Sequence, residues 1–253
     1  MFDIAVNLAD EKLRADAGGV LTRACDAGVD HCLLVGTDIQ ESQWLAERAS
    51  AWQQPFTAGI HPHYVKDRQP DWLTALRELA ALPGCVAVGE TGLDFFRMLS
   101  PKAQQIESCQ AHLDLAMELN LPVYLHDREA SDELISILSP RAGLSGVVHC
   151  FTGSQAALEA YLGLGLSIGI TAWCLDERRG QDLAKLVPMI PGDRLMVETD
   201  APYLTPRDLR PRPKHNEPQF LPHIIEGIAR LRGESPEHLA RQTTDNARRL
   251  FAC

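Results

Sequence analysis

The sequence lacks several patterns that would place it at once in a class of proteins. Its seven cysteines form no Cys-x-x-Cys pair and are odd in number, so neither a structural zinc site nor a disulfide framework is indicated. No apolar run approaches the roughly 18 residues that a membrane span needs, and no basic segment followed by an apolar stretch opens the chain. We therefore expect a cytoplasmic protein with reduced thiols and no membrane partner.

Positive charge is also scarce. The 253 residues include 24 Lys and Arg against 34 Asp and Glu, which gives a formal net charge of −10. The long-range field therefore repels phosphate groups, and any contact with nucleic acid has to depend on a metal ion and a local basic patch. No Gly-x-Gly-x-x-Gly follows the first predicted strand, which removes the usual signature of dinucleotide binding.

What the sequence does contain is a regular alternation of apolar runs and helical patterns. The predicted strands cover residues 2–6, 31–35, 56–60, 86–90, 123–126, 146–149, 166–170 and 195–199. The predicted helices cover residues 12–27, 38–51, 71–82, 101–120, 131–138, 155–164, 176–187, 219–231 and 236–251. Near-continuous apolar strands are typical of a parallel sheet, and eight strand–helix units in about 250 residues are the size of a (β/α)8 barrel.

This pattern predicts an α/β protein, a single barrel domain over residues 1–253 with an extra C-terminal helix. The alternative is a doubly wound open sheet. No low-complexity linker or internal repeat divides the chain.

Several predicted strands end on residue types that bind metals. They lead to His61, Glu90, His126, His149 and Asp200. Because the carboxyl ends of barrel strands meet at one face, we expect Glu90, His126, His149 and Asp200 to share one divalent cation that keeps a position open for water or substrate. Such an ion lowers the pKa of a bound water and polarises a phosphoryl or carbonyl oxygen, so the residues alone predict metal-assisted hydrolysis of an undefined substrate.

Two of these carboxylates are candidate catalytic residues, namely Glu90 and Asp200. Asp200 is either a metal ligand or the base that takes a proton from water, and the sequence does not separate these roles. His61 and His63 lie on a turn stiffened by Pro62 and are candidates to bind substrate phosphate or a second ion. The alternative for this pair is that they are loop histidines facing solvent.

Six segments along the chain carry a family resemblance. They are Gly59–His63, Gly89–Asp94, Leu125–Ala130, His149–Gly153, Glu198–Leu204 and Asn216–Pro218. Together they resemble the TatD-type metal-dependent deoxyribonucleases, in the order of that family and over nearly the whole chain. The resemblance implies an amidohydrolase-like barrel that acts as a magnesium-dependent 3′–5′ exonuclease on single-stranded DNA and RNA. It also implies metal-site roles for Glu90, His126, His149 and Asp200, and active-site roles for His61 and His63.

The first strand departs from the pattern of many relatives. Those relatives begin with Asp-x-His-x-His, whereas this chain has Asp3, Ala5 and Asn7 at the matching positions. Ala5 cannot bind a metal and Asn7 is a weak oxygen donor, so we predict one firmly held ion. Magnesium is the first expectation for activity, although sites that contain histidine also suit zinc or manganese.

Basic and aromatic residues flank these motifs. In the segment 206–218, the part before His215 carries Arg207, Arg210, Arg212 and Lys214 against one acid, Asp208. We expect this loop, through Arg207, and Arg128 to hold phosphates of a single strand; the alternatives are a solvated loop and an ion pair of Arg128 with a nearby acid. Phe95, Phe96, Trp173 and Tyr203 are candidates to stack bases, or to pack in the core.

Two other functions remain open on the sequence. The same barrel fold also serves enzymes that hydrolyse small amides or esters, and fold does not fix function. A barrel that has lost catalysis and only binds nucleic acid is the second, which the missing first-strand histidines keep open. We expect a monomer with single-stranded DNA or RNA as its partner.

Overall fold

The computed structural model describes all 253 residues and contains one sheet of eight parallel strands in the order β1 to β8. The strands are β1 Phe2–Val6, β2 His31–Leu34, β3 Phe56–Ala58, β4 Cys85–Asp94, β5 Val123–Arg128, β6 Gly146–Val148, β7 Ser167–Ile170 and β8 Leu195–Val197. A parallel bridge between Val6 and Ala201 joins the two ends of the sheet. The predicted (β/α)8 barrel is confirmed.

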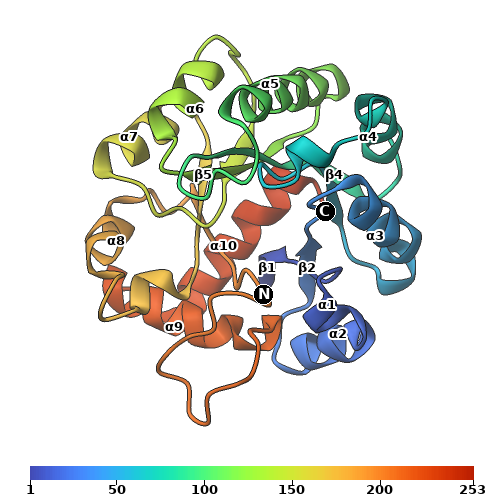
Figure 1. Cartoon of the computed structure of the whole chain (residues 1–253). Coiled ribbons are helices and arrows are strands. Elements are labelled where there is room, and N and C mark those ends of the chain that lie inside the picture. The colour runs from blue at the N-terminus through green and yellow to red at the C-terminus, as the bar shows by residue number, and fades with distance from the viewer.

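Helices surround the barrel as a ring (Figure 1). They are α1 Glu11–Arg14, α2 Ala17–Asp26, α3 Ile39–Trp52, α4 Trp72–Ala80, α5 Lys102–Leu119, α6 Ser131–Leu138, α7 Gln155–Gly163, α8 Gln181–Leu186, α9 Leu221–Arg232 and α10 Pro236–Phe251. Short 3-10 turns add η1 Val65–Asp67, η2 Ala172–Leu175, η3 Val187–Met189 and η4 Pro218–Phe220. None of these helices has the length and the hydropathy that a membrane-spanning segment requires.

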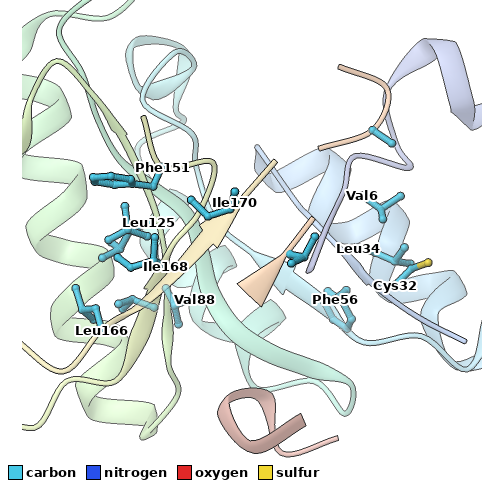
Figure 2. Close-up of a cluster of buried hydrophobic side chains, with 14 of the residues drawn as sticks. Val6, Cys32, Leu34, Phe56, Val88, Leu125, Phe151, Leu166, Ile168 and Ile170 are labelled. Carbon is cyan, nitrogen blue, oxygen red and sulfur yellow. The ribbon is translucent and has the colours of Figure 1, made fainter. Parts of the chain in front are cut away.

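Alternation of side chains along the strands produces two apolar clusters. Cys32 and Leu34 belong to a cluster of 55 buried residues between the strands and the helices, part of which Figure 2 shows. Leu33 lies between them in sequence and belongs to a second cluster of 11 residues. Because successive strand residues point to opposite faces, the larger cluster packs the helices onto the barrel and the smaller one fills its interior.

The C-terminal helix α10 covers one end of the barrel. Ala247 and Phe251 belong to the interior cluster together with Phe2 and Ile4 of β1, and Figure 1 shows α10 lying across the middle of the ring of helices. The strands begin at this end. Their carboxyl ends, where the metal-binding residue types lie, are therefore at the opposite end of the barrel.

Most element boundaries agree with the sequence prediction within a few residues, and three do not. Strand β4 extends to Asp94, four residues beyond its predicted end at Glu90. The single helix predicted over 12–27 is split into α1 and α2, because Asp16 stands in a non-helical conformation between them. The helix predicted over 176–187 begins only at Gln181, because Asp176 accepts hydrogen bonds from the backbone N–H groups of Arg178 and Arg179 and forms a turn instead. Asp is a common turn former for this reason.

Candidate metal centre

The strand pattern directs two histidines into the barrel. His126 follows the interior residue Tyr124 by two positions, and His149 follows the interior residue Val147 by two positions. Because side chains of a strand repeat on the same face every second residue, both imidazoles point towards the barrel axis at its open end. His149 is 5% exposed, and its ring stacks on that of Tyr124 at 4.7 Å between centroids.

Glu90 stands at the centre of these side chains. Its Oε1 atom lies 2.7 Å from His149 Nε2, 3.0 Å from His126 Nδ1 and 3.3 Å from His61 Nε2. The preceding Gly89 has φ +149°, and a Cβ there would clash with the carbonyl oxygen of Tyr124. A glycine is therefore needed to bring β4 against β5 just before Glu90.

The cluster favours an ionised Glu90. Burial alone would raise the pKa of Glu90, but the imidazoles of His149 and His61 and hydrogen bonds with His126 and His149 hold it well below its ordinary value. Burial alone would lower the pKa of His149, but Glu90 and Glu198 raise it well above its ordinary value. Burial raises the pKa of Asp200 to about 7 and lowers that of His61 to about 4.

The donor set fits a divalent cation. His126 Nε2 and His149 Nδ1 are buried and form no hydrogen bond, although each lies within 3.7 Å of a carboxylate oxygen, of Asp94 and Glu198 respectively. A buried polar atom without a partner costs about 1–3 kcal/mol. Imidazole nitrogens beside several carboxylates are a usual ligand environment for divalent ions, and binding one would compensate for this cost.

The sequence predicted Glu90, His126, His149 and Asp200 as the ligands of one ion, and the most closely spaced donor atoms in the structure form a different group. The donor atoms of His61, Glu90 and His126 all lie within 4.8 Å of one another, so His61, which was expected to bind substrate, is placed with the candidate metal ligands. His149 contacts the same oxygen of Glu90 but is not part of that group. Asp200 is not part of it either; its Oδ1 accepts a hydrogen bond from Asn7 Nδ2 at 3.0 Å.

Asn7 and Ala5 therefore leave the β1 edge of the site without an imidazole. The amide of Asn7 donates to Asp200 and to the carbonyl oxygen of Ala201, so its nitrogen joins β1 to the segment after β8. Ala5 is fully buried. Asp3 is also buried and accepts hydrogen bonds from the N–H and the hydroxyl of Thr199, at 2.9 and 2.5 Å, so its carboxylate is used to close the barrel.

Two acids within the family-like segments, Asp94 and Glu198, were not predicted as site residues but lie against the histidines. Asp94, at the end of β4, has its Oδ2 atom 2.6 Å from His63 Nε2 and 3.5 Å from His126 Nε2. Glu198 is fully buried and accepts hydrogen bonds from the Cys150 N–H and the Tyr124 hydroxyl. The two-residue spacing of Glu198 and Asp200 was the available signal for Glu198, because it predicts one shared face.

A third missed residue lies in a helix. His112 of α5 is fully buried, accepts a hydrogen bond at Nε2 from the Ile60 N–H (3.0 Å), and has Nδ1 2.7 Å from the Ser108 carbonyl oxygen. Its Nδ1 therefore carries the proton. Ile60 directly precedes His61, so His112 anchors the turn that carries His61 and His63.

The predicted phosphate-binding arginines occupy two separate places. Arg128 ends β5 and lines a cavity of about 730 Å³ with Thr152 and Trp173. No carboxylate lies within 4.0 Å of it, and it donates to Thr152 Oγ1 at 3.3 Å. Arg207 instead pairs with Asp176 at 3.0 Å and lines a second cavity beside α8 and α9.

The aromatic candidates also differ in their surroundings. Phe96 is 53% exposed, and Trp173 is partly exposed; the Arg128 guanidinium lies 5.2 Å from the first ring and 6.0 Å from the second. Phe95 is partly buried against the core and lies under Lys102. Tyr203 is exposed, and its hydroxyl donates to Asp10.

Comparison with known proteins gives one family over nearly the whole chain. Residues 2–252 match the sequence profile of the TatD related DNase family. The chain belongs to this family. A TatD from Erwinia billingiae, named a 3′-5′ ssDNA/RNA exonuclease, is 50% identical over 260 residues, covering 99% of this chain and 98% of that protein. A TatD of the same name from Yersinia pseudotuberculosis is 49% identical, with 99% of each chain covered.

Solved structures of TatD relatives have the same barrel. The crystal structure of YjjV, a TatD homologue from Escherichia coli K12, superposes with a TM-score of 0.93 at 26% identity and covers 100% of this chain and 98% of that one. A TatD family hydrolase from Entamoeba histolytica gives a TM-score of 0.90 at 24% identity over 99% and 97% of the two chains. At that identity the second structure supports the fold alone.

Proposed function

We propose that this chain is a metal-dependent nuclease that removes nucleotides from the 3′ end of single-stranded DNA or RNA. The observation that carries the proposal is Glu90 Oε1, which has three imidazole nitrogens within 3.3 Å at the open end of the barrel. Relatives about half identical to the whole chain are named 3′-5′ ssDNA/RNA exonucleases, and this supports the choice of substrate.

The residues that would hold the ion are Glu90, His126, His149 and Asp200, joined by His61. A divalent cation bound there would supply acidity to a water molecule and polarise the phosphoryl oxygen of the bond to be cut. Asp200, at the edge of this set, would also accept the proton of the attacking water. We propose magnesium as the ion used for activity, although the imidazole-rich donor set also suits zinc or manganese.

Three further side chains orient the strand. His63, held by Asp94 at 2.6 Å, and Arg128, which has no acidic partner, bind the phosphate next to the ion, because a guanidinium binds two phosphate oxygens at once. Arg207 binds a phosphate further along the strand.

We propose that one ion is held firmly. The β1 edge offers Asn7 and Ala5 instead of two imidazoles, and the Asn7 amide already donates to Asp200. Metal analysis of purified protein is therefore expected to give about one tightly bound equivalent per chain. Two tightly bound equivalents would contradict this assignment.

The test of the function is product analysis on labelled single strands blocked at the 3′ or at the 5′ end, with magnesium, manganese, zinc or a chelator. The 5′-blocked strand should release mononucleotides, whereas the 3′-blocked strand and the chelated enzyme should not. The Glu90→Ala variant should lose more than about 100-fold in kcat/KM. Undiminished activity of this variant would assign the nuclease to a contaminant, and release from acyl-amino acids alone would favour an amidase.

We also propose that the whole chain acts as one domain and as a cytoplasmic monomer. The helix ring and α10 are built around the same barrel, and the net charge of −10 opposes self-association. Light scattering is expected to give the mass of one chain.

A further inference from the structure

The second cavity has an unusual concentration of arginines. It encloses about 700 Å³ and is lined by Arg178 after η2, by Arg207, Arg210 and Arg212 in the loop between β8 and α9, and by Arg230 on α9. In Figure 1 this loop is the orange segment that extends from the body of the molecule. We call these five residues the arginine pocket.

Three acids line the same cavity and neutralise the arginine pocket only in part. Asp176 is already bound by Arg207 at 3.0 Å and by Arg179 at 3.2 Å, and Asp208 lies 2.9 Å from His223. Glu177 is exposed and forms no ion pair, so five guanidinium groups face three carboxylates.

The other four arginines of the pocket have no carboxylate within 4.0 Å. Arg210 donates instead to two backbone carbonyl oxygens of its own loop, and all four are exposed. In a chain with a net charge of −10, four unpaired guanidinium groups around one cavity form a local site for a polyanion.

A row of contacts connects this pocket with the metal centre. Arg128 is two residues beyond His126 and shares the first cavity with Trp173 and Arg179. Arg179 stacks on Trp173 at 4.4 Å and pairs with Asp176, which also holds Arg207. The η2 segment thus separates two neighbouring cavities, one lined by Arg128 and the other by the arginine pocket.

We propose that the arginine pocket is a second binding site, which holds backbone phosphates of the single strand several nucleotides 5′ of the bond that is cut. The strand passes from the metal centre along the Arg128 and Trp173 side of the first cavity, where bases stack on Trp173, and reaches the arginine pocket beyond η2. This inference rests on the proposed nuclease function. Its consequence is that long strands are bound better than strands too short to span both cavities.

The experiment replaces Arg210, Arg212 and Arg230 together by Gln and leaves Arg207 in place, because Arg207 holds Asp176. The matched control replaces Arg241, Arg248 and Arg249 by Gln. These three exposed arginines lie on α10, at the other end of the barrel, so both triple variants have the same net charge. Thermal unfolding of each variant verifies that the fold is retained.

The substrates are labelled oligothymidines of about 3 and about 15 nucleotides. In the pocket variant, kcat/KM on the long strand should fall about 10-fold and the slope of log affinity against log salt should flatten by about 2, since a single-strand phosphate contact contributes about 0.7 to it. Activity on the short strand should stay within about twofold of the unmodified enzyme, as should the control variant on both strands.

Equal losses on both lengths, or equal losses in the two triple variants, would overturn the pocket assignment. An unmodified enzyme without nuclease activity would instead refute the proposed function. In that case fluorescence anisotropy with the long strand still tests the pocket, because weaker binding by the pocket variant alone supports it, and equal binding by both variants excludes it.

Discussion

His112 is a buried base whose protonation state is fixed by its two hydrogen bonds. It accepts from the Ile60 N–H and donates to the Ser108 carbonyl, which only the neutral ring can do. Burial lowers its pKa from 6.5 to about 4. The unfolded chain therefore takes up a proton at this position below pH 6.5, whereas the folded chain does so only near pH 4.

This difference predicts a loss of stability in acid. Stability from His112 is fully present above pH 6.5 and is lost as the pH falls to 4, and at about 1.4 kcal/mol for each pKa unit the loss is about 3 kcal/mol. Urea unfolding at several pH values should show a free energy of unfolding that falls more steeply for the unmodified protein than for His112→Gln, which cannot titrate. Parallel curves for the two proteins would contradict the buried neutral histidine.

Asp94 illustrates how an acid outside the group of closely spaced donor atoms can set the geometry of the site. It lies 2.6 Å from His63 Nε2 and 3.5 Å from His126 Nε2. Carboxylates that orient ligating histidines typically contribute about 10–100-fold in metal affinity or activity. Asp94→Asn is therefore expected to lower metal affinity by this factor, measured by competition with a fluorescent chelator. The control is Asp182→Asn, which alters an exposed acid and should leave the metal affinity unchanged.

Sequence reasoning found the residues at the strand ends and missed those that support them. Glu90, His126 and His149 stand out because each follows an apolar run, and a barrel brings such ends to one face. His112 gives no such signal, since it lies inside a helix and meets Ile60 across 52 positions of sequence. His61 was predicted as a site residue, but its turn left open whether it binds substrate, binds a second ion or faces solvent; the folded chain places it 3.3 Å from Glu90.

Helix α10 closes the end of the barrel at which the strands begin. Phe251 is 2% exposed and its ring lies 6.2 Å from that of Phe2. Removing a buried phenylalanine side chain costs about 3–5 kcal/mol, so Phe251→Ala should lower the free energy of unfolding by about 3 kcal/mol. Activity per folded molecule should not change, because the metal centre is at the opposite end.

The matched control for this change is Met117→Ala. Met117 lies on α5 and is 47% exposed, so its truncation should alter stability by less than about 0.5 kcal/mol. Denaturant unfolding of both variants checks the pair. Equal losses would show that the α10 contact does not stabilise the barrel.

A helix boundary was predictable where the spacing of apolar residues and a capping residue indicate the same starting position. Asp38 accepts from the Glu41 N–H at 2.7 Å, and α3 begins one residue after it, as its sequence indicates. The extent of β4 was not predictable, because its last residues, through Asp94, are strand only by pairing with β5. The late start of α8 was not predictable either. The hydrogen bonds that Asp176 accepts from Arg178 and Arg179 form a turn where the sequence pattern predicts the first residues of the helix.

The barrel as a whole gathers side chains from β4 and β5, and from the segments that follow β3, β6 and β8, at its open end. None of these groups is close in the unfolded chain, so a cation that needs all of them binds only the folded state. Such binding stabilises the fold by RT ln(1 + [L]/Kd), which is about 2.7 kcal/mol at 100 times Kd.

Removal of the ion is therefore expected to lower the unfolding temperature of the protein by about 2–4 °C for each kcal/mol lost. Differential scanning calorimetry with a chelator, and then with magnesium, manganese or zinc restored, measures the shift. The Glu90→Ala variant removes the carboxylate that the imidazoles share, so its unfolding temperature should no longer respond to the cation. A response of the same size in the variant would mean that the stabilising ion binds elsewhere on this acidic chain.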